Sequence, residues 1–325
     1  MFRFACLGLV IAAVAGCQDD VAQTPSEAGA SDQYTIVTTC GMVTDIVRGV
    51  AGERAEVIGL LGEGVDPHLY KPTRNDRKQM MAADVIFYCG LMLEGKMEEA
   101  FLEVADEQTL VVPVGEAIDK NRLRSPAEFE GHPDPHVWMD VSLWQDCVRE
   151  VARQLTEYDP ESAAVYEDNA ARLLAELSQL DTYARETIAT IPTEQRVLVT
   201  AHDAFGYFAQ AYGLEVKSVQ GISTISEAGV KHINDLVDFV VERRIRAIFV
   251  ESSVSKANIT AIIEGAAARD WEVRVGGELF SDAMGPGGTY EGTYVGMIDH
   301  NVTTIAAALG GEAPADGMQG KLSPE

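Results

Sequence analysis

A long segment near the middle of this 325-residue chain limits the folds that the chain can adopt. Residues 161–191 contain neither glycine nor proline, and their apolar side chains recur at helical spacing. This pattern predicts one helix of about 30 residues, roughly 45 Å long. Helices of this length are unusual in globular proteins. The segment is therefore predicted to be a rigid strut between two lobes, and the alternative is a long helix packed on one domain.

Strands and helices alternate on both sides of this segment. Hydrophobic runs predict strands at residues 34–40, 55–61, 84–89, 109–114, 196–200, 215–219, 247–250 and 271–275. Helical spacing predicts helices at residues 41–50, 73–83, 141–158, 203–212, 226–243, 258–269 and 292–309. In the second of these helices Thr73 and Asp76 occupy capping-box positions, and Ser226 is predicted to cap the fifth. Strands that alternate with helices indicate mainly parallel sheets.

The predicted fold class is therefore α/β, with two lobes that are each a mainly parallel sheet flanked by helices and are joined by one long rigid helix. The predicted divisions are a signal peptide at 1–16, a tether at 17–32, an N-terminal lobe at 33–158, the connecting helix at 159–192, a C-terminal lobe at 193–312 and a tail at 313–325.

The N-terminal residues are predicted to form a targeting signal. Arg3 precedes an apolar run at residues 4–15, and two small residues lie before Cys17. Cleavage before Cys17 and acylation of its thiol would make the chain a lipoprotein, with the polar residues 17–32 as a flexible tether. The alternative is a secreted protein with an incidental cysteine. No later run approaches the roughly 20 apolar residues of a membrane-spanning helix, so lipid is the predicted anchor.

The net charge limits which partners the chain can bind, and the cysteine content limits which disulfides and cysteine motifs it can form. The formal charge is −26, which argues against nucleic acid or an anionic membrane surface as a partner. Beyond the N-terminal region, Cys40, Cys89 and Cys147 form no CxxC motif and no disulfide framework. Cys40 and Cys89 each end a predicted strand. They either form one disulfide or remain as buried thiols, and the sequence favours the thiols.

Four residues in loops that follow hydrophobic runs carry metal-binding chemistry: His68, His136, His202 and Asp282. Imidazole nitrogens together with a carboxylate are ligands that a divalent transition metal binds. Two of the residues lie in each half of the chain, and parallel α/β sheets bind ligands beyond the carboxyl ends of their strands. A metal held by all four would lie between the two lobes.

The local sequence around the histidines supports this interpretation. His202 lies between a strand and a predicted helix, whose positive N-terminus disfavours the imidazolium and so favours the neutral ring that a metal requires. His68 and His136 each follow an Asp-Pro pair. Proline fixes the backbone before the ligand, and Asp66 and Asp134 are predicted to hydrogen-bond the ligands from outside the site.

The other polar residues are weaker candidates. A loop aspartate such as Asp282 commonly serves in a cap or turn, so it has little weight alone. Glu251 ends a strand and either supports a ligand or forms a salt bridge. His132 is predicted to be exposed, because two prolines exclude a helical pair with the next histidine. His232 is predicted to be exposed on a helix, and His300 to be structural.

Five motifs resemble those of one family: GVDPHLYKPT, DPHVWMDV, VLVTAHDAFGYFAQAYG, AIFVESS and GGELFSDAMGPGGTYEGTYVGMIDHN. The chain resembles the TroA-type manganese- and zinc-binding proteins of bacterial ABC importers from about residue 34 to about residue 309. In that family, two α/β lobes are bridged by one long helix, and the metal lies in the cleft. The resemblance implies that His68, His136, His202 and Asp282 are the ligands.

The resemblance leaves the metal open. Members that resemble manganese-selective proteins often carry glutamate at the third ligand position, whereas this chain has His202. The long loop rich in histidine and acidic residues that dedicated zinc binders carry is missing. Intrinsic affinity favours zinc over manganese.

The predicted function is capture of Zn²⁺ or Mn²⁺ outside the cytoplasm by a monomeric lipoprotein and its delivery to a membrane permease. The alternatives are a zinc hydrolase, a surface adhesin stabilised by metal, and a binder of organic solutes. A catalytic zinc normally keeps one position open for water. Four protein ligands would fill that position, and the chain has no HExxH motif, so a carrier rather than an enzyme is predicted.

Overall fold

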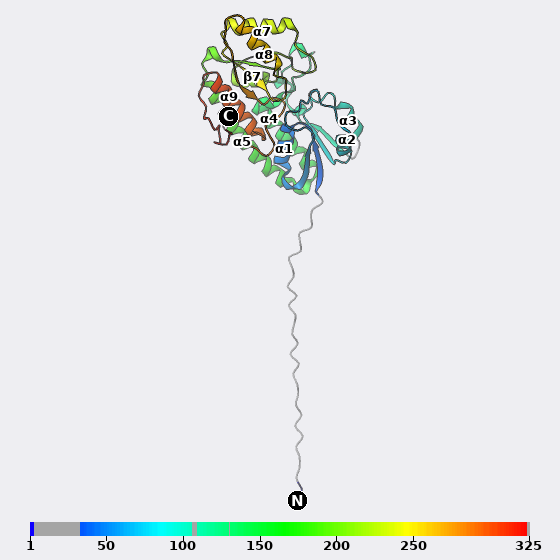
Figure 1. The fold of residues 1–325 in the computed structure, drawn as a ribbon. Coiled ribbons are helices and arrows are strands. Elements are labelled where there is room, and N and C mark those ends of the chain that lie inside the picture. The colour runs from blue at the N-terminus through cyan, green and yellow to red at the C-terminus, as the bar shows by residue number, and fades with distance from the viewer. Residues whose placement is uncertain (3–32, 106–108, 130, 324–325) are drawn as a thin grey trace. The chain divides into compact units, whose positions relative to one another are not determined.

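The computed structural model describes residues 1–2, 33–105, 109–129 and 131–323. Its contacts divide the chain into Met1–Asp32 and Gln33–Glu325, and the description below concerns the second unit (Figure 1). Residues 3–32 lie outside the described part. The predicted signal peptide, apart from residues 1–2, the predicted lipidation of Cys17 and the predicted tether all fall on these residues. Within the described part, none of the helices combines the length and the apolar character needed to span a bilayer.

The first lobe is built on a four-stranded parallel sheet. Its strands are β1 (Tyr34–Thr38), β2 (Ala55–Gly59), β3 (Val85–Tyr88) and β4 (Leu110–Pro113), in the order β2-β1-β3-β4. Side chains alternate across this sheet. Ile36 and Phe87 point into the core that includes α1 and α4, whereas Val37 and Ile86 join the apolar cluster with α2 and α3.

Four α-helices accompany this sheet: α1 (Gly41–Ala51), α2 (Arg74–Met81), α3 (Glu98–Val104) and α4 (Val141–Tyr158). The capping box of α2 is confirmed, because Thr73 Oγ1 accepts from the N–H of Asp76 at 3.2 Å and Asp76 accepts in return at 2.6 Å. Helix α3 is not among the helices predicted from the sequence. Its seven residues are too few to establish a helical period against the loop that precedes them.

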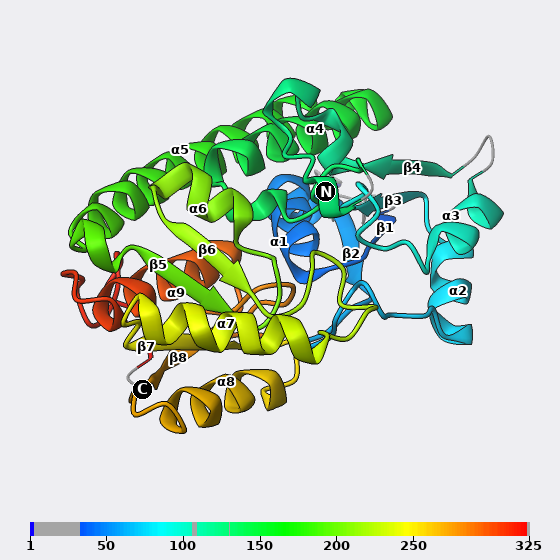
Figure 2. The same ribbon diagram turned by 90° about the horizontal axis from the view of Figure 1, so that it is seen from above.

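The long helix is α5 (Ala163–Ala189), with 27 residues, and a single 3-10 turn precedes it. Its first half contacts α1, since Asn169 donates to the carbonyl of Val50 at 2.9 Å. Its second half contacts α9 and α6, where Tyr183 bonds Thr303 at 2.8 Å and Arg185 donates to the carbonyl of Ala211. In Figure 2, α5 runs along one edge of the molecule and passes both lobes. The predicted strut is confirmed.

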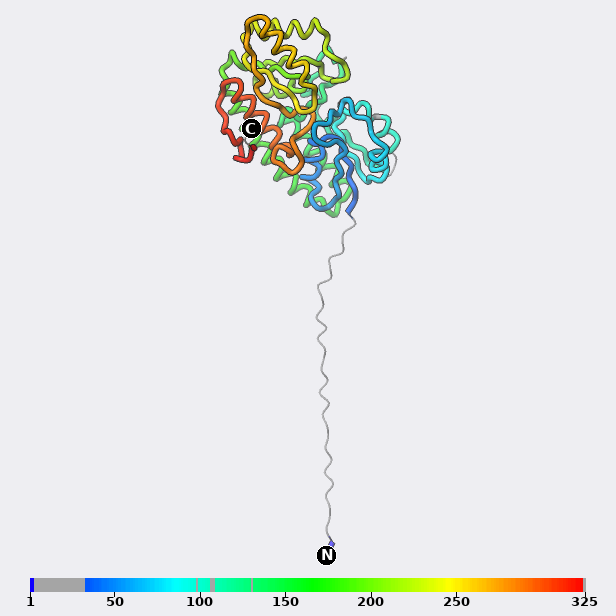
Figure 3. The backbone as a smooth tube through the Cα atoms, viewed as in Figure 1, coloured from blue at the N-terminus to red at the C-terminus, as the bar shows by residue number. Residues whose placement is uncertain are grey.

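The second lobe contains two two-stranded parallel sheets. One pairs β5 (Val197–Thr200) with β6 (Glu215–Ser218), and the other pairs β7 (Ala247–Glu251) with β8 (Arg274–Leu279). Helices α7 (Val230–Glu242) and α8 (Ala257–Ala267) cover one face, and α6 (Gly206–Tyr212) and α9 (Tyr294–Ala308) lie on the other. The segment that follows α9 lies beside α9 and α5 (Figure 3), where the N–H of Met318 donates to Asp299 of α9 and Gln319 donates to Glu176 of α5.

Two predicted helix starts in this lobe are wrong. Helix α6 begins at Gly206 rather than at residue 203, and α7 begins at Val230 with Gly229 as its N-cap. Ser226 therefore caps no helix. It lies in the preceding loop, where its carbonyl accepts a hydrogen bond from Gln220 at 3.3 Å. Serine favours turns as well as N-caps, so the residue type alone did not distinguish them.

The two lobes share one apolar core. A single cluster of buried side chains includes Ile46 of α1, Trp144 of α4, Leu180 of α5, Phe208 of α6 and Ile298 of α9. Because helices from both lobes contribute to the same core, separating the lobes would expose apolar surface to water. The fold therefore resists large rigid-body motion of one lobe against the other.

Candidate metal centre

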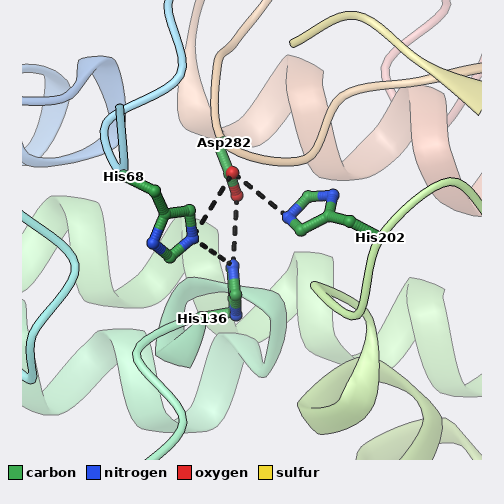
Figure 4. A group of neighbouring side chains, drawn as sticks. All are labelled: His68, His136, His202 and Asp282. Atoms are coloured by element: carbon green, nitrogen blue, oxygen red, sulfur yellow. Dashed lines mark hydrogen bonds and ion pairs between the residues drawn. The ribbon is translucent and has the colours of Figure 1, made fainter. Parts of the chain in front are cut away.

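The four side chains singled out in the sequence come together in one buried group (Figure 4). His68 lies between β2 and α2, and His136 lies just before the 3-10 turn that leads into α4. His202 and Asp282 follow β5 and β8. Each is at most 2% exposed. The group therefore lies where the loops of the two lobes meet, as the two-lobe arrangement requires.

The distances between the candidate ligand atoms fit a small metal ion. Nε2 of His136 lies 3.3 Å from Nε2 of His68 and 3.3 Å from Oδ1 of Asp282. Oδ2 of Asp282 lies 3.1 Å from Nε2 of His202 and 3.8 Å from Nε2 of His68. Zinc with ligands at about 2.0–2.1 Å in a tetrahedron would have edges of about 3.3–3.4 Å between its ligand atoms.

The centre of this group also carries unsatisfied polar atoms. Three buried atoms have no hydrogen-bond partner among the residues described: the two carboxylate oxygens of Asp282 and Nε2 of His202. While Nε2 of His136 and of His202 is unprotonated, the Asp282 carboxylate has no donor, which is costly, because buried polar groups are almost always paired. A divalent cation at the centre would satisfy these atoms at once, so the residues present fit a metal.

Carboxylates outside the group orient two of the three imidazoles. Nδ1 of His136 donates to Oδ1 of Asp134 at 2.8 Å, and Nδ1 of His202 donates to Oε2 of Glu251 at 2.5 Å. Each carboxylate also accepts the backbone N–H of the histidine that it orients. Because carboxylates only accept, Nδ1 carries the proton and Nε2 is left to face the centre.

His68 is held in a different way. Asp66 accepts the backbone N–H of His68 at 2.8 Å through Oδ1, rather than a hydrogen bond from its ring. Its other oxygen accepts from Oγ1 of Thr224 at 2.6 Å. Thr224 belongs to the second lobe, so the carboxylate of Asp66 connects the backbone of His68 to the opposite lobe.

The electrostatics of the group are those of a cation site. Burial lowers the pKa of His68 to about 3. Burial also disfavours charge on His136, but Asp282 and Asp134 outweigh it and raise its pKa to about 9. The pKa of His202 is raised well above its usual value, because Glu251 and Asp282 overcome its burial. Likewise, His202 and His136 hold the pKa of Asp282 well below the usual range despite its burial.

The predicted influence of a helix N-terminus on His202 is therefore wrong. Helix α6 begins four residues after His202, and the ring is instead paired with two carboxylates. Those carboxylates favour the imidazolium in the absence of metal. A bound metal would replace the Nε2 proton, since a ligating imidazole must be neutral there.

Hydrogen bonds tie the Asp282 loop to its surroundings. Nε1 of Trp138 donates to the carbonyl of Ser281 at 2.9 Å, and the hydroxyl of Tyr294 donates to the carbonyl of Trp138. Asn301 of α9 bonds both the N–H and the carbonyl of Phe280. The loops that carry His136 and Asp282 are thus fixed to one another, and sequence reasoning did not single out these partners.

The remaining histidines and cysteines lie as predicted. His132 is exposed, and His232 is exposed on α7 with Nε2 against the carbonyl of Ser218. His300 on α9 contacts the carbonyl of Glu278 at 2.9 Å and so has a structural role. The cysteines of the described part, Cys40, Cys89 and Cys147, are buried and free.

Comparison with known proteins gives consistent matches along most of the chain. The manganese-binding lipoprotein MntA of Bacillus subtilis is 44% identical over 91% of this chain and 95% of its own length. The zinc-binding protein TroA of Treponema pallidum is 46% identical over 87% of this chain and 91% of its own.

A solved structure of the periplasmic zinc-binding protein TroA from Treponema pallidum matches with a TM-score of 0.83 and 45% identity. That match covers 85% of this chain and 99% of the other. The predicted two-lobe α/β fold and the TroA-type resemblance are confirmed. The model of the family described as zinc-uptake complex component A, periplasmic, matches residues 36–308. This chain therefore belongs to the ZnuA family of periplasmic zinc-uptake components.

Proposed function

We propose that this chain captures Zn²⁺ or Mn²⁺ outside the cytoplasm and delivers it to the permease of an ABC importer, with His68, His136, His202 and Asp282 as the metal ligands. One observation carries the proposal. Three imidazole Nε2 atoms converge on a buried carboxylate whose two oxygens have no hydrogen-bond donor among the described residues. The relatives named as manganese- and zinc-binding proteins support the same cargo.

The closed set of ligands favours a carrier over an enzyme. Three nitrogens and one carboxylate oxygen complete a tetrahedral site, whereas a catalytic zinc keeps a position for water. Both oxygens of Asp282 face the group, so a bidentate carboxylate would raise the coordination number and suit manganese as well. Selectivity then depends on how rigidly the loops hold the four side chains and on which metal is available.

We further propose that the mature protein is a monomer held at the membrane by lipid on Cys17. Several relatives are named as lipoproteins. In this proposal residues 33–158 and 193–312 form the lobes, 159–192 connect them, and 313–325 form a tail. Mass spectrometry of the protein extracted from membranes, compared with a Cys17→Ser variant, tests the anchor.

Metal binding tests the ligand assignment directly. After removal of metal with a chelator, the wild-type protein should bind one Zn²⁺ or Mn²⁺ per chain. His136→Ala and His202→Ala should lose tight binding, whereas His232→Ala, which alters an exposed histidine on α7, should not. Calorimetric titration and metal content after gel filtration provide the readouts. A His202→Ala protein that binds metal like the wild type would refute the proposed ligand set.

A further inference from the structure

Arg124 is a partly buried cation beside the candidate metal centre that the ligand assignment does not use. It lies in the loop between two 3-10 turns, Lys120–Arg122 and Ala127–Phe129. Its side chain is 24% exposed, and its guanidinium forms an ion pair with the fully buried carboxylate of Asp134. A buried carboxylate with a charged partner is held in a defined orientation by that partner.

The pair reaches the metal centre through one side chain. Oδ2 of Asp134 receives the Nη1 donor of Arg124, and Oδ1 receives Nδ1 of His136 at 2.8 Å. The backbone N–H of His136 also donates to Oδ1, at 3.0 Å. Both oxygens of Asp134 thus accept hydrogen bonds, so moving the guanidinium would change the orientation of the carboxylate relative to the imidazole of His136.

The same arginine contacts the opposite lobe. Its guanidinium lies over the ring of Tyr207 in α6, 5.5 Å from the ring centre. The hydroxyl of Tyr207 accepts the backbone N–H of Arg124 at 3.0 Å and donates to the carbonyl of Asp134 at 3.0 Å. Arg124 and Asp134 belong to the first lobe, and α6 follows His202 in the second.

Gly206 makes room for this contact. A Cβ placed on Gly206 would overlap with the guanidinium of Arg124. Its φ is not among the positive values, so backbone conformation does not require glycine at this position. The absence of a side chain at the start of α6 instead leaves the space that the guanidinium fills.

His202 is supported without such a cation. Its partner Glu251 accepts from Nδ1 and from the backbone N–H of His202, and within the described residues no lysine or arginine forms an ion pair with Glu251. Both imidazoles therefore have a carboxylate partner, but only the carboxylate beside His136 is itself paired with a cation, Arg124, among the described residues.

We propose that Arg124 is a positioning residue for metal binding. It fixes the carboxylate of Asp134, and through it the imidazole of His136, relative to the segment that carries His202. The inference rests on the proposed function, because it concerns how a proposed ligand is held. The residue acts through contacts that join the two ligand-bearing lobes, rather than by touching the metal.

Two substitutions at Arg124 test the role, and Arg122 provides a matched control. Arg124→Met removes the charge, whereas Arg124→Lys retains it. Arg122→Met alters an exposed arginine two residues away that pairs with Asp146. The Zn²⁺ dissociation constant, measured in competition with a chromophoric chelator, should rise about 10-fold in Arg124→Met, as for other supports of metal ligands. Arg124→Lys should restore part of the affinity, and Arg122→Met should bind like the wild type.

Gly206→Ala tests the same contact without altering a charge. Alanine favours helix over glycine, so α6 itself should not be weakened, but the new Cβ must displace the guanidinium. Metal affinity should fall, while circular dichroism of the metal-free protein should show that the fold is kept. The absorption spectrum of bound Co²⁺ should shift in Gly206→Ala and in Arg124→Met, which a purely structural role would not produce.

The outcomes separate the two proposals. Wild type that binds neither Zn²⁺ nor Mn²⁺ would overturn the proposed function and this inference with it. Wild type that binds metal, together with Arg124→Met and Gly206→Ala proteins that bind it equally well with an unchanged Co²⁺ spectrum, would overturn the inference alone. If Arg124→Met does not fold, Arg124→Lys and Gly206→Ala decide the question by the same measurements.

Discussion

At the scale of single residues, the candidate site depends on which nitrogen of each imidazole faces the centre. Asp134 and Glu251 decide this for His136 and His202, because an acceptor-only carboxylate at Nδ1 leaves Nε2 for the metal. Sequence reasoning singled out Asp134 from the Asp-Pro-His motif and left Glu251 open between support and salt bridge. The hydrogen bond from His202 shows that Glu251 supports this imidazole.

Glu251→Gln should weaken metal binding about 10- to 100-fold. An amide offers only one acceptor oxygen, whereas the carboxylate of Glu251 accepts both from Nδ1 and from the backbone N–H of His202. One of those donors would face the amide NH₂ group and lose its partner. Chelator competition measures the effect, with Glu215→Gln, which alters a partly exposed carboxylate in β6, as control. Equal affinity of the two variants would contradict the role of Glu251.

At the scale of elements, helix starts and loops show where local pattern is sufficient. The start of α2 was predicted correctly from Thr73 and Asp76, because the capping box is a contact between residues only three positions apart. The starts of α6 and α7 were placed too early. There the backbone before the helix is held by partners that are distant in sequence, such as Gly221, whose carbonyl accepts the N–H of Asp203.

The capping box of α2 should make stability depend on pH. Burial acts to raise the pKa of Asp76, but hydrogen bonds from Tyr70 and Thr73 outweigh it and lower that pKa. A lowered pKa means that the carboxylate stabilises the fold above the unfolded-state value of about 4 and loses this effect as the pH falls below it.

Asp76→Asn should accordingly lower the free energy of unfolding by about 1 kcal/mol at pH 7. The difference from wild type should shrink as the pH is lowered toward the pKa of the folded carboxyl. Urea unfolding of the metal-free proteins at a series of pH values measures it. A difference that is the same at every pH would show that the charge of Asp76 contributes nothing.

The loop contact between Thr224 and Asp66 should slow metal release. Thr224→Val removes the hydroxyl but keeps the shape of the side chain, and one hydrogen bond of about 1 kcal/mol corresponds to a rate factor of about five. Zn²⁺ transfer to excess chelator in stopped flow should therefore be faster in Thr224→Val. Thr224→Ser, which keeps the hydroxyl, should release metal nearly as slowly as the wild type. Unchanged release in both variants would exclude the contact as a restraint.

At the scale of the whole molecule, the shared core and α5 should limit lobe motion. Residues of α1, α4, α6 and α9 pack in one apolar cluster with α5, so opening the lobes widely would cost burial energy. Small-angle scattering of metal-free and metal-loaded protein should therefore give nearly the same radius of gyration. A clear decrease on adding metal would indicate a hinge closure that this core does not allow.

Metal should stabilise the folded chain as a whole. The four side chains come from loops spread over more than 200 residues, so the site exists only in the folded state. Binding then raises the melting temperature by mass action. The free energy of unfolding increases by about 2.7 kcal/mol when the metal concentration is 100-fold above the dissociation constant. Thermal unfolding with and without Zn²⁺ or Mn²⁺ checks this, and the His136→Ala protein should show no such shift.

The alternation of strands and helices, the long helix and the four residues with metal-binding chemistry could be predicted from the chain alone, because each depends on local periodicity or on residue type. The folded structure was needed to show that Nε2 of His68, His136 and His202 meets the carboxylate of Asp282, and that Arg124 reaches both Asp134 and α6. These contacts join residues 10 to more than 200 positions apart. Packing of the two lobes on α5 sets such distances, and no periodic pattern in the chain encodes them.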